Sequence, residues 1–341
     1  GYGRWRNYYK DLLDRVGVTA HVLRVGKFKS FAEPWSSNAP SQEALEAEGA
    51  LYGSLWQSWT AGVEKARRLP AGSVAQAIES LPGSLQAAGG DPARWALERK
   101  WVDALKTRDE VRALLIERGA KHDDGQTFRQ VSLGRYLGSL KPARGGDAVG
   151  VIVAQGEISD GREPAGRVGG LSTAELVRQA REDDDIKAVV LRVNSPGGSA
   201  FGSELVRREL ELTRAAGKPV VVSMGDVAAS GGYWIAMAAD EVIADEATIT
   251  GSIGVVALLP TAEGAMDKLG VRTGGVATTW LAGAYDPRRA FDPRLGQLVQ
   301  SIIDRAYLDF TTLAAKARQT TQARIDEVGQ GRVWSGRQAL E

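Results

Sequence analysis

The second half of the chain alternates short apolar runs with stretches of helical periodicity. Runs rich in β-branched or other apolar residues predict strands at residues 149–158, 186–193, 219–223 and 241–249. Between them, residues 172–182 and 200–216 place apolar side chains three to four residues apart, which predicts helices. Strands and helices in this order predict an α/β domain whose strands are buried, largely parallel and flanked by helices.

The first third of the chain repeats part of this plan. Residues 16–18 match residues 269–271, and each segment leads into a long amphipathic stretch. The two stretches align so that Trp56 corresponds to Tyr307. Because self-similarity of this kind indicates duplication, we predict two copies of one domain.

The repeat also predicts the domain boundaries. We expect residues 1–137 to form the C-terminal half of a first domain, and residues 148–341 to form most of a second domain whose last segment is missing. Residues 138–147 are rich in glycine and basic residues and predict the linker. The chain is thus expected to be a fragment of a duplicated protein.

Charge and composition exclude several kinds of site and partner. The 43 lysines and arginines nearly balance the 42 aspartates and glutamates and are interspersed with them, which argues against a nucleic-acid partner. The chain has no cysteine, so it has no disulfide, thiol nucleophile or thiolate metal site. No run of about 18 apolar residues occurs, so no segment is expected to span a bilayer.

One serine has the surroundings of a displayed nucleophile. Ser230 comes after the predicted strand 219–223 and directly before Gly231, in a run of small residues where a helix is expected to begin. Small neighbours let a substrate carbonyl approach the backbone, and the free N–H groups of a helix N-terminus favour developing negative charge. A serine needs a base, so its role depends on which residue accepts its proton.

A glycine motif follows another predicted strand. Residues 194–198 read Asn-Ser-Pro-Gly-Gly, and two glycines after a proline allow backbone N–H groups to point toward a bound carbonyl oxygen. Together with the N–H of Gly231 they would form an oxyanion hole. An ordinary strand-to-helix turn is the simpler interpretation of the motif by itself.

The residue that acts as base is not settled by the local pattern. His122 lies in a polar stretch typical of a surface loop, and His21 fits a half-buried, hydrogen-bonded ring in a strand. A lysine can replace histidine when burial lowers its pKa. Lys27 and Lys29 both lie among apolar residues. If the strand continued through them, they would face the same side, because side chains alternate with a period of two, so this pattern does not choose between them. Ser252, in a glycine turn, could hold the amine or be an ordinary turn serine.

Four motifs in this order resemble the signal peptide peptidase A family, also called protease IV, in its long, duplicated bacterial form. They are residues 27–34, 193–198, 224–234 and 250–254. The resemblance covers nearly the whole chain. It implies a layered α/β fold like that of the Clp protease proteolytic subunit and the crotonases, with a first crotonase-like domain that carries the lysine and a second that carries the serine.

The resemblance also implies the chemistry of a Ser-Lys dyad peptidase. Ser230 would be the nucleophile, Lys29 the general base and Ser252 the hydroxyl that positions the amine, while Gly197 and Gly231 would supply the oxyanion N–H groups. Hydrolysis would pass through an acyl-enzyme, and neither a metal nor an organic cofactor would be required.

The family further implies partners and a location. Its members unite the dyad across neighbouring subunits of a ring-like tetramer, are anchored to the bacterial inner membrane, and degrade released signal peptides at the periplasmic face. We therefore expect a homo-oligomer that acts on hydrophobic peptides, with an anchor in the full-length protein that is absent from these residues. Two alternatives are a crotonase-type acyl-CoA enzyme, which would need another acid/base group and an adenine pocket, and an inactive scaffold on the same fold.

Overall fold

The computed structural model describes residues 2–123, 125, 127–140, 146–274, 279–281 and 283–341. The chain forms two compact units. The large unit comprises Gly1–Trp56 and Asp147–Glu341, and the small unit comprises Gln57–Gly146. The long helix α3 (Gln42–Arg67) contributes residues to both units.

A six-stranded sheet forms the centre of the large unit. Its strands are β2 (Ala148–Gln155), β5 (Ile186–Ser195), β6 (Val220–Ala229), β7 (Glu241–Ile243), β8 (Ile249–Gly251) and β10 (Val333–Ser335). The order is β10-β8-β6-β5-β2, with β7 also paired to β6, and each pair is parallel except β10 with β8. The predicted α/β class with a largely parallel sheet is confirmed.

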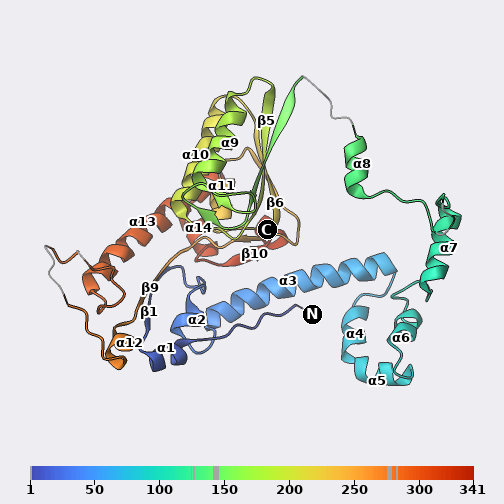
Figure 1. Cartoon of the computed structure of the whole chain (residues 1–341), viewed down its shortest axis with the longest axis horizontal. Coiled ribbons are helices and arrows are strands. Elements are labelled where there is room, and N and C mark those ends of the chain that lie inside the picture. Colours follow the sequence, from blue (N-terminus) through green and yellow to red (C-terminus); the bar gives the residue numbers. More distant parts are fainter. Residues whose placement is uncertain (1, 124, 126, 141–145, 275–278, 282) are drawn as a thin grey trace. The chain divides into compact units, whose positions relative to one another are not determined.

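Two helices pack against this sheet (Figure 1). α9 (Gly170–Glu182) contacts β2 and β5, and α10 (Ala200–Ala215) lies beside α9 and contacts β6. The fully buried side chains between sheet and helices are Val177, Val189, Leu191, Val193, Val206, Leu210, Val220 and Val222. Burial of each contributes about 1.5–3 kcal/mol, so the sheet is a firm support for the loops at its strand ends.

Strand β2 is less buried than the sequence predicted. Ile152 and Ala154 are buried, but Val149, Val151 and Val153 are 57%, 65% and 59% exposed. The reason is that β2 lies at the end of the strand order and α9 packs on one of its faces, so alternate side chains face away from the helix.

The predicted strand at residues 241–249 is divided in the structure. β7 ends at Ile243, and a turn closed by the N–H of Thr248 on the carbonyl of Asp245, at 3.0 Å, separates it from β8. β8 then pairs with the end of β6, where Gly251 lies opposite Ala229. The division brings the end of β8 next to Ser230.

An antiparallel ribbon joins the N-terminal segment to the second half of the chain. β1 (Thr19–Val25) pairs along its whole length with β9 (Val255–Thr261), and Figure 1 draws the blue strand beside the orange one. α13 (Pro293–Ala317) packs on both strands. This pairing places residues 1–56 in the large unit, whereas the sequence predicted that they belong with residues 57–137. Long-range pairing leaves no mark on local periodicity, which explains the difference.

The predicted linker at residues 138–147 is only partly described. Gly138 and Ser139 complete the helix α8 (Leu133–Ser139), and residues 141–145 lie outside the described residues. The boundary between the two units falls at Gly146 and Asp147.

The remaining elements of the large unit surround the ribbon and the sheet. They are α1 (Lys10–Val16), α2 (Glu33–Ser36), α11 (Gly231–Ala236), α12 (Glu263–Lys268), α14 (Gln322–Val328), α15 (Gly336–Leu340), β3 (Ile158–Ser159) and β4 (Val168–Gly169). A second apolar core joins α11, α13 and α14. Its buried members are Trp234, Met237, Ile253, Tyr307, Phe310, Ala314, Ala315 and Ile325.

The small unit consists of short helices around a small core. Its helices beyond α3 are α4 (Ser73–Glu79), α5 (Leu81–Ala87), α6 (Pro92–Glu98), α7 (Arg108–Arg118) and α8. Ala77, Ala88 and Trp95 are buried there, and the indole N–H of Trp95 donates to Ser84 Oγ at 2.9 Å. Buried Glu64 accepts the N–H of Val74 at 2.9 Å and so holds the start of α4.

The two long helices that the repeat aligns end in the same way. After α3, Arg68 takes a φ of 54° and the N–H of Leu69 donates to the carbonyl of Glu64; after α13, Gln319 takes a φ of 52°. There the N–H of Thr320 donates to the carbonyl of Ala315, which is the same left-handed termination. The repeated sequence has therefore kept the same local structure.

Among the described residues, no helix combines the length and the apolar character that crossing a bilayer requires. The anchor expected for the full-length protein stays a prediction.

Candidate active site

Ser230 occupies a strained turn between β6 and α11. Its φ is 54° and its ψ is −119°, a backbone conformation that costs a non-glycine residue on the order of 1–3 kcal/mol. Two hydrogen bonds hold it, because its N–H donates to the carbonyl of Gly251 at 2.8 Å and its carbonyl accepts the N–H of Trp234 at 2.9 Å. The turn displays the half-buried hydroxyl at the end of the sheet.

The small residues after Ser230 are required by close packing. A Cβ on Gly231 would lie 2.5 Å from Ser203 Oγ, and a Cβ on Gly232 would lie 2.6 Å from the carbonyl oxygen of Ser195. These two glycines therefore let α11 begin directly against α10 and the end of β5.

The Lys29 amine lies among three oxygens. Its Nζ is 3.2 Å from Ser230 Oγ, 3.0 Å from Ser252 Oγ and 3.1 Å from the Ser252 carbonyl oxygen. Burial lowers the pKa of Lys29 to about 8. A neutral amine has two N–H donors and one lone pair, so the two Ser252 oxygens can accept the donors while the lone pair faces the Ser230 hydroxyl.

Ser252 is itself held in a strained conformation. Its φ is 54°, and its N–H donates to the carbonyl of Arg332 at 2.7 Å. The preceding Gly251 has a φ of 79°, and a Cβ there would lie 2.9 Å from Trp334 Cδ1. Ser230 and Ser252 thus share a left-handed φ on either side of one amine, as strained residues often do at functional sites.

The structure distinguishes Lys29 from Lys27. β1 ends at Val25, and residues 26–28 form a turn rather than a continued strand, so the alternation of a strand does not apply there. The Lys27 side chain is exposed, and its Nζ lies 4.9 Å from the centre of the Phe28 ring. Only Lys29 of the pair approaches Ser230.

The lysine and the serine come together within one chain. The resemblance led us to expect that neighbouring subunits unite them, but the β1–β9 ribbon carries Lys29 to the end of β8 in the same molecule. The geometry of the pair therefore does not require a second subunit. The tetramer itself stays a prediction.

The two predicted oxyanion donors differ in their surroundings. Gly197 has a φ of 103°, and a Cβ on it would lie 2.6 Å from Gly231 N, so the loop after β5 touches the nucleophile turn. However, the N–H of Gly197 donates to Ser195 Oγ at 3.2 Å. Within the described part of the chain, the N–H groups of Gly198 and Gly231 have no hydrogen-bond acceptor. The motif offered both loop glycines as donors, and the resemblance implied Gly197 for the role.

The two histidines take no part in this arrangement. His21 Nε2 lies 3.1 Å from Thr261 Oγ1, its ring stacks on Phe291 with centres 4.0 Å apart, and burial lowers its pKa. That is the half-buried, bonded ring which the sequence suggested. His122 belongs to the small unit. Among the residues that the structure describes, no cluster of three histidine or acidic side chains could hold a metal ion.

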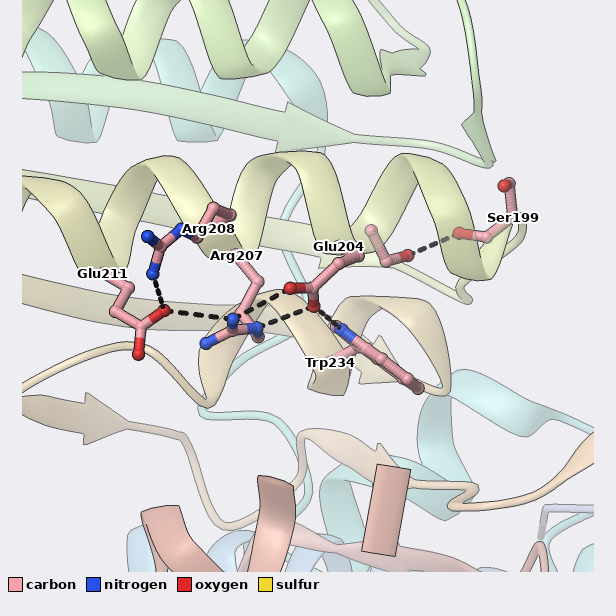
Figure 2. Close-up of polar contacts among 7 residues, drawn as sticks. Ser199, Glu204, Arg207, Arg208, Glu211 and Trp234 are labelled. Atoms are coloured by element: carbon pink, nitrogen blue, oxygen red, sulfur yellow. Dashed lines mark hydrogen bonds and ion pairs between the residues drawn. The ribbon is translucent and has the colours of Figure 1, made fainter. Parts of the chain in front are cut away.

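A charged network lies behind the nucleophile helix (Figure 2). The indole N–H of Trp234 donates to Glu204 at 2.8 Å, and Arg207 donates to Glu204 at 2.7 and 2.8 Å and to Glu211 at 3.1 Å. Burial alone would raise the pKa of Glu204, but the bonds from Arg207 and Trp234 outweigh it and hold that pKa below its usual value. The network ties α11, which follows Ser230, to α10, which follows the glycine loop.

Comparison with known proteins gives one family and several long relatives. The profile of Peptidase family S49 matches residues 4–121 and 213–341. "Protease 4" of Salmonella typhi is 43% identical over 333 residues, which cover 97% of this chain and 53% of that protein. "Protease 4" of Haemophilus influenzae is 38% identical over 343 residues, with 98% and 55% covered.

A plant relative and a solved structure extend the comparison. "Serine protease SPPA, chloroplastic" of Arabidopsis thaliana is 32% identical over 344 residues, covering 98% of this chain and 49% of that protein. The chain therefore spans about half the length of the curated relatives it matches. Among solved structures, a ClpP1 mutant from Listeria monocytogenes is similar at a TM-score of 0.35 and 11% identity, with 55% of this chain and 84% of that chain covered.

Proposed function

The chain belongs to peptidase family S49, and from this premise we propose that it is a serine endopeptidase that hydrolyses hydrophobic peptides with a Ser230-Lys29 dyad. The observation that carries the proposal is the Lys29 amine, with a pKa lowered to about 8, placed 3.2 Å from Ser230 Oγ. Hydrogen-bond reach and a pKa near the working pH are the two requirements of a general base.

The lowered pKa makes the base available. With a pKa of about 8, roughly a tenth of the amine is neutral at pH 7. An ordinary lysine, with a pKa of about 10.4, would have less than about one part in a thousand neutral at that pH. Burial of Lys29 thus raises the population of the competent base by about two orders of magnitude.

The steps of the reaction follow from the contacts of the two groups. Neutral Lys29 takes the hydroxyl proton of Ser230 while Oγ attacks the peptide carbonyl, and the resulting ammonium donates that proton to the leaving amine. Ser252 supports both forms of the amine, because its Oγ and carbonyl oxygen accept from Nζ throughout. Water then attacks the acyl-enzyme while Lys29 accepts its proton, and the ester bond to Ser230 breaks as Lys29 returns that proton to Ser230 Oγ.

The oxyanion of the tetrahedral intermediate would bind beside the helix start. Gly231 offers an N–H there, and the Gly197-Gly198 loop offers a second one. Of the two loop glycines, Gly198 has the N–H without an acceptor among the described residues, whereas the N–H of Gly197 must leave Ser195 Oγ to serve. Loss of one such donor typically costs about 10²–10³ in rate.

The substrate, the assembly and the location are the wider part of the proposal. Released signal peptides, a homotetramer and the periplasmic face of a bacterial inner membrane are supported by the motifs that resemble signal peptide peptidase A. The alternatives are an acyl-CoA enzyme and an inactive scaffold, and they predict different chemistry at Ser230.

Trapping the covalent intermediate tests the function. The chain is mixed with an activated ester of a hydrophobic peptide, quenched in acid within one turnover, and digested for mass spectrometry. An acyl group on Ser230, absent when coenzyme A thioesters replace the peptide ester, supports the peptidase. A folded chain that forms no adduct with the peptide ester contradicts it, and turnover of a thioester alone favours the acyl-CoA enzyme.

A further inference from the structure

The turn that carries Lys29 rests against a second turn, at Gln330 and Gly331. The carbonyl oxygen of Gln330 accepts the N–H of Phe28 at 2.8 Å, and its side-chain Oε1 accepts the N–H of Lys27 at 3.3 Å. A Cβ on Gly331 would lie 2.8 Å from the backbone nitrogen of Lys29. The two turns are therefore in backbone contact, and a shift of one must move the other.

The same second turn also contacts the segment between β8 and β9 that carries Ser252. The N–H of Gly331 donates to the carbonyl of Ile253 at 2.6 Å, and the carbonyl of Arg332 accepts the N–H of Ser252 at 2.7 Å. Residues 330–332 thus hold the lysine turn on one side and the Ser252 backbone on the other. The distance between the amine and its acceptors depends on this short segment.

Gln330 is in turn fixed by two side chains, Tyr307 of the second core and Asp326 of α14. The hydroxyl of Tyr307, on α13, donates to Asp326 Oδ1 at 2.6 Å. Gln330 Nε2 donates to the same Asp326 oxygen at 2.5 Å and lies 3.2 Å from the Tyr307 hydroxyl. Tyr307 is buried, and burial together with its bond to Asp326 raises the pKa of its phenol, so the hydroxyl keeps its proton and acts as a donor.

The backbone of Gln330 shows that this position is constrained. Its φ is 53°, in the left-handed region that glycine or asparagine usually occupies. A glutamine persists there because its side-chain amide bonds on both sides, to the Lys27 N–H through Oε1 and to Tyr307 and Asp326 through Nε2. A strained residue held by the hydrogen bonds of its own side chain points to a functional requirement.

We propose that Gln330, fixed by Tyr307 and Asp326, is the positioning residue that keeps the Lys29 amine against Ser230 and Ser252. The inference rests on the proposed function, because it assigns Gln330 a role in placing the base of that reaction. Gln330 touches the turn of the lysine and none of the reacting atoms. The charged side chains on the segments packed around the Lys29 turn are Lys27, Asp326 and Arg332. The pKa of Lys29 is lowered by burial.

A matched pair of glutamines tests the inference, one at the first position of α14 and one just after its end. Gln330→Ala removes both side-chain contacts of the turn, whereas Gln322→Ala removes a bond from Gln322 Nε2 to Thr311 Oγ1, at 3.0 Å, that also ties α14 to α13. We expect Gln330→Ala to lower kcat/KM for a hydrophobic peptide ester about 10- to 100-fold at pH 7, mainly through kcat. Gln322→Ala should stay within about twofold of the unaltered chain.

The pH dependence separates positioning from a loss of stability. A loosened turn admits water to the amine, so Gln330→Ala should raise the pKa of Lys29 from about 8 toward the ordinary lysine value. The midpoint of the kcat/KM profile should move to higher pH by the same amount, and part of the activity should return there. Tyr307→Phe keeps the ring in the core and removes the hydroxyl. It should raise the pKa of Lys29 and the midpoint of the kcat/KM profile by a smaller amount.

Competitive acylation of the lysines with acetic anhydride, read by mass spectrometry across pH, measures the Lys29 pKa without turnover. An unchanged Lys29 pKa and an unchanged kcat/KM profile in folded Gln330→Ala and Tyr307→Phe would overturn the inference, and so would an equal loss in Gln322→Ala. If the chain hydrolyses no ester but the Lys29 pKa still rises in Gln330→Ala and not in Gln322→Ala, the placement of the amine by Gln330 is upheld and the proposed function fails by itself.

Discussion

The two regions that meet at the site are built in different ways. Ser230 ends β6, a central strand of the parallel sheet in which Val220, Val222 and Ala228 are fully buried. Lys29 follows β1, a strand of a two-stranded ribbon whose side chains are half-buried or exposed. The proposed nucleophile is therefore supported by the well-packed core of the fold, and the proposed base is supported by a thinner, less buried ribbon.

This difference teaches that the two members of the proposed dyad depend on different interactions. The Ser230 turn is held by β6 before it, by α11 after it and by a hydrogen bond to the carbonyl of Gly251. The Lys29 turn is held by residues about 300 positions away in the sequence, at Gln330 and Gly331. Changes in the ribbon should therefore alter the base while leaving the nucleophile turn in place.

Removing the nucleophile should have the largest effect. Ser230→Ala deletes Oγ, and we expect kcat for a hydrophobic peptide ester to fall by at least about 10⁴-fold, leaving only what binding and the oxyanion donors supply. Stopped-flow or discontinuous ester assays measure the loss. Because the sheet holds the turn, the thermal midpoint should change by no more than a few degrees; substantial remaining turnover would show that Ser230 is not the nucleophile.

Removing the base should have the next largest effect. Lys29→Met keeps the length of the side chain and deletes the amine, and we expect kcat/KM to fall about 10²–10⁴-fold, the usual contribution of a general base. Full activity in a folded Lys29→Met chain would reject the assignment.

The same variant tests how burial of the Lys29 amine affects the stability of the folded chain. The pKa of Lys29 is lower in the folded chain than in the unfolded chain, so between about pH 8 and the ordinary lysine value the unfolded state binds more protons. The stability of the unaltered chain, relative to Lys29→Met, should therefore rise with pH through that window. The reason is that the amine loses its proton in the unfolded chain as well, so folding no longer has to remove a charge in order to bury it. Thermal unfolding at pH 7 and pH 10 measures the difference.

In the unaltered chain, we expect pH to change kcat/KM by about tenfold. Since the neutral amine is the competent form, kcat/KM should increase with pH through a midpoint near 8 and be about tenfold higher at pH 9 than at pH 7. A midpoint near 6.5 would indicate a histidine base instead. Initial rates with an ester that is stable over this range provide the profile.

Ser252→Ala should cost less than the loss of either dyad member. It removes one of the two Ser252 oxygens that accept from the amine and leaves the carbonyl oxygen in place. We expect a loss of about tenfold in kcat/KM, the scale of one hydrogen bond of about 1.4 kcal/mol. A loss as large as that of Lys29→Met would mean that Ser252 takes part in the proton transfer.

Lys27→Met should have the smallest effect and serves as the control for Lys29. The Lys27 side chain is exposed beside the Phe28 ring and does not reach the serines. We expect kcat/KM to stay within about twofold, as for most exposed substitutions. A loss comparable to that of Lys29→Met would contradict the distinction between the two lysines.

Much of the candidate site could be recognised before the structure was known, for reasons that are local. The strand, the small residues and the helix start around Ser230 are neighbours in sequence, and the glycine motif at residues 194–198 is another short segment. Such motifs specify their own backbone geometry, because glycine permits turns and close contacts that other residues do not. The choice between Gly197 and Gly198 could not be made from the motif, since only the hydrogen bonds show which N–H is already occupied.

The choice between Lys27 and Lys29 could not be made from the pattern of residues. A period of two places both on one face, and only the end of β1 at Val25 shows that no strand continues through them. Gln330 carried no signal at all, because its role depends on contacts with residues far away in the chain. The sequence grouped residues 1–56 with residues 57–137, whereas they lie in the large unit, for the same reason, as β1 pairs with a strand from the other half.

By itself, the sequence determined the α/β class and the display of Ser230, because each depends on periodicity or on turn chemistry within a few residues. Only the tertiary structure decided which lysine meets that serine, that one chain can unite them, and which residues hold the amine in place. The physical reason is that desolvation and hydrogen-bond reach are properties of the assembled surroundings, and the ribbon creates them by packing segments that lie more than 200 residues apart.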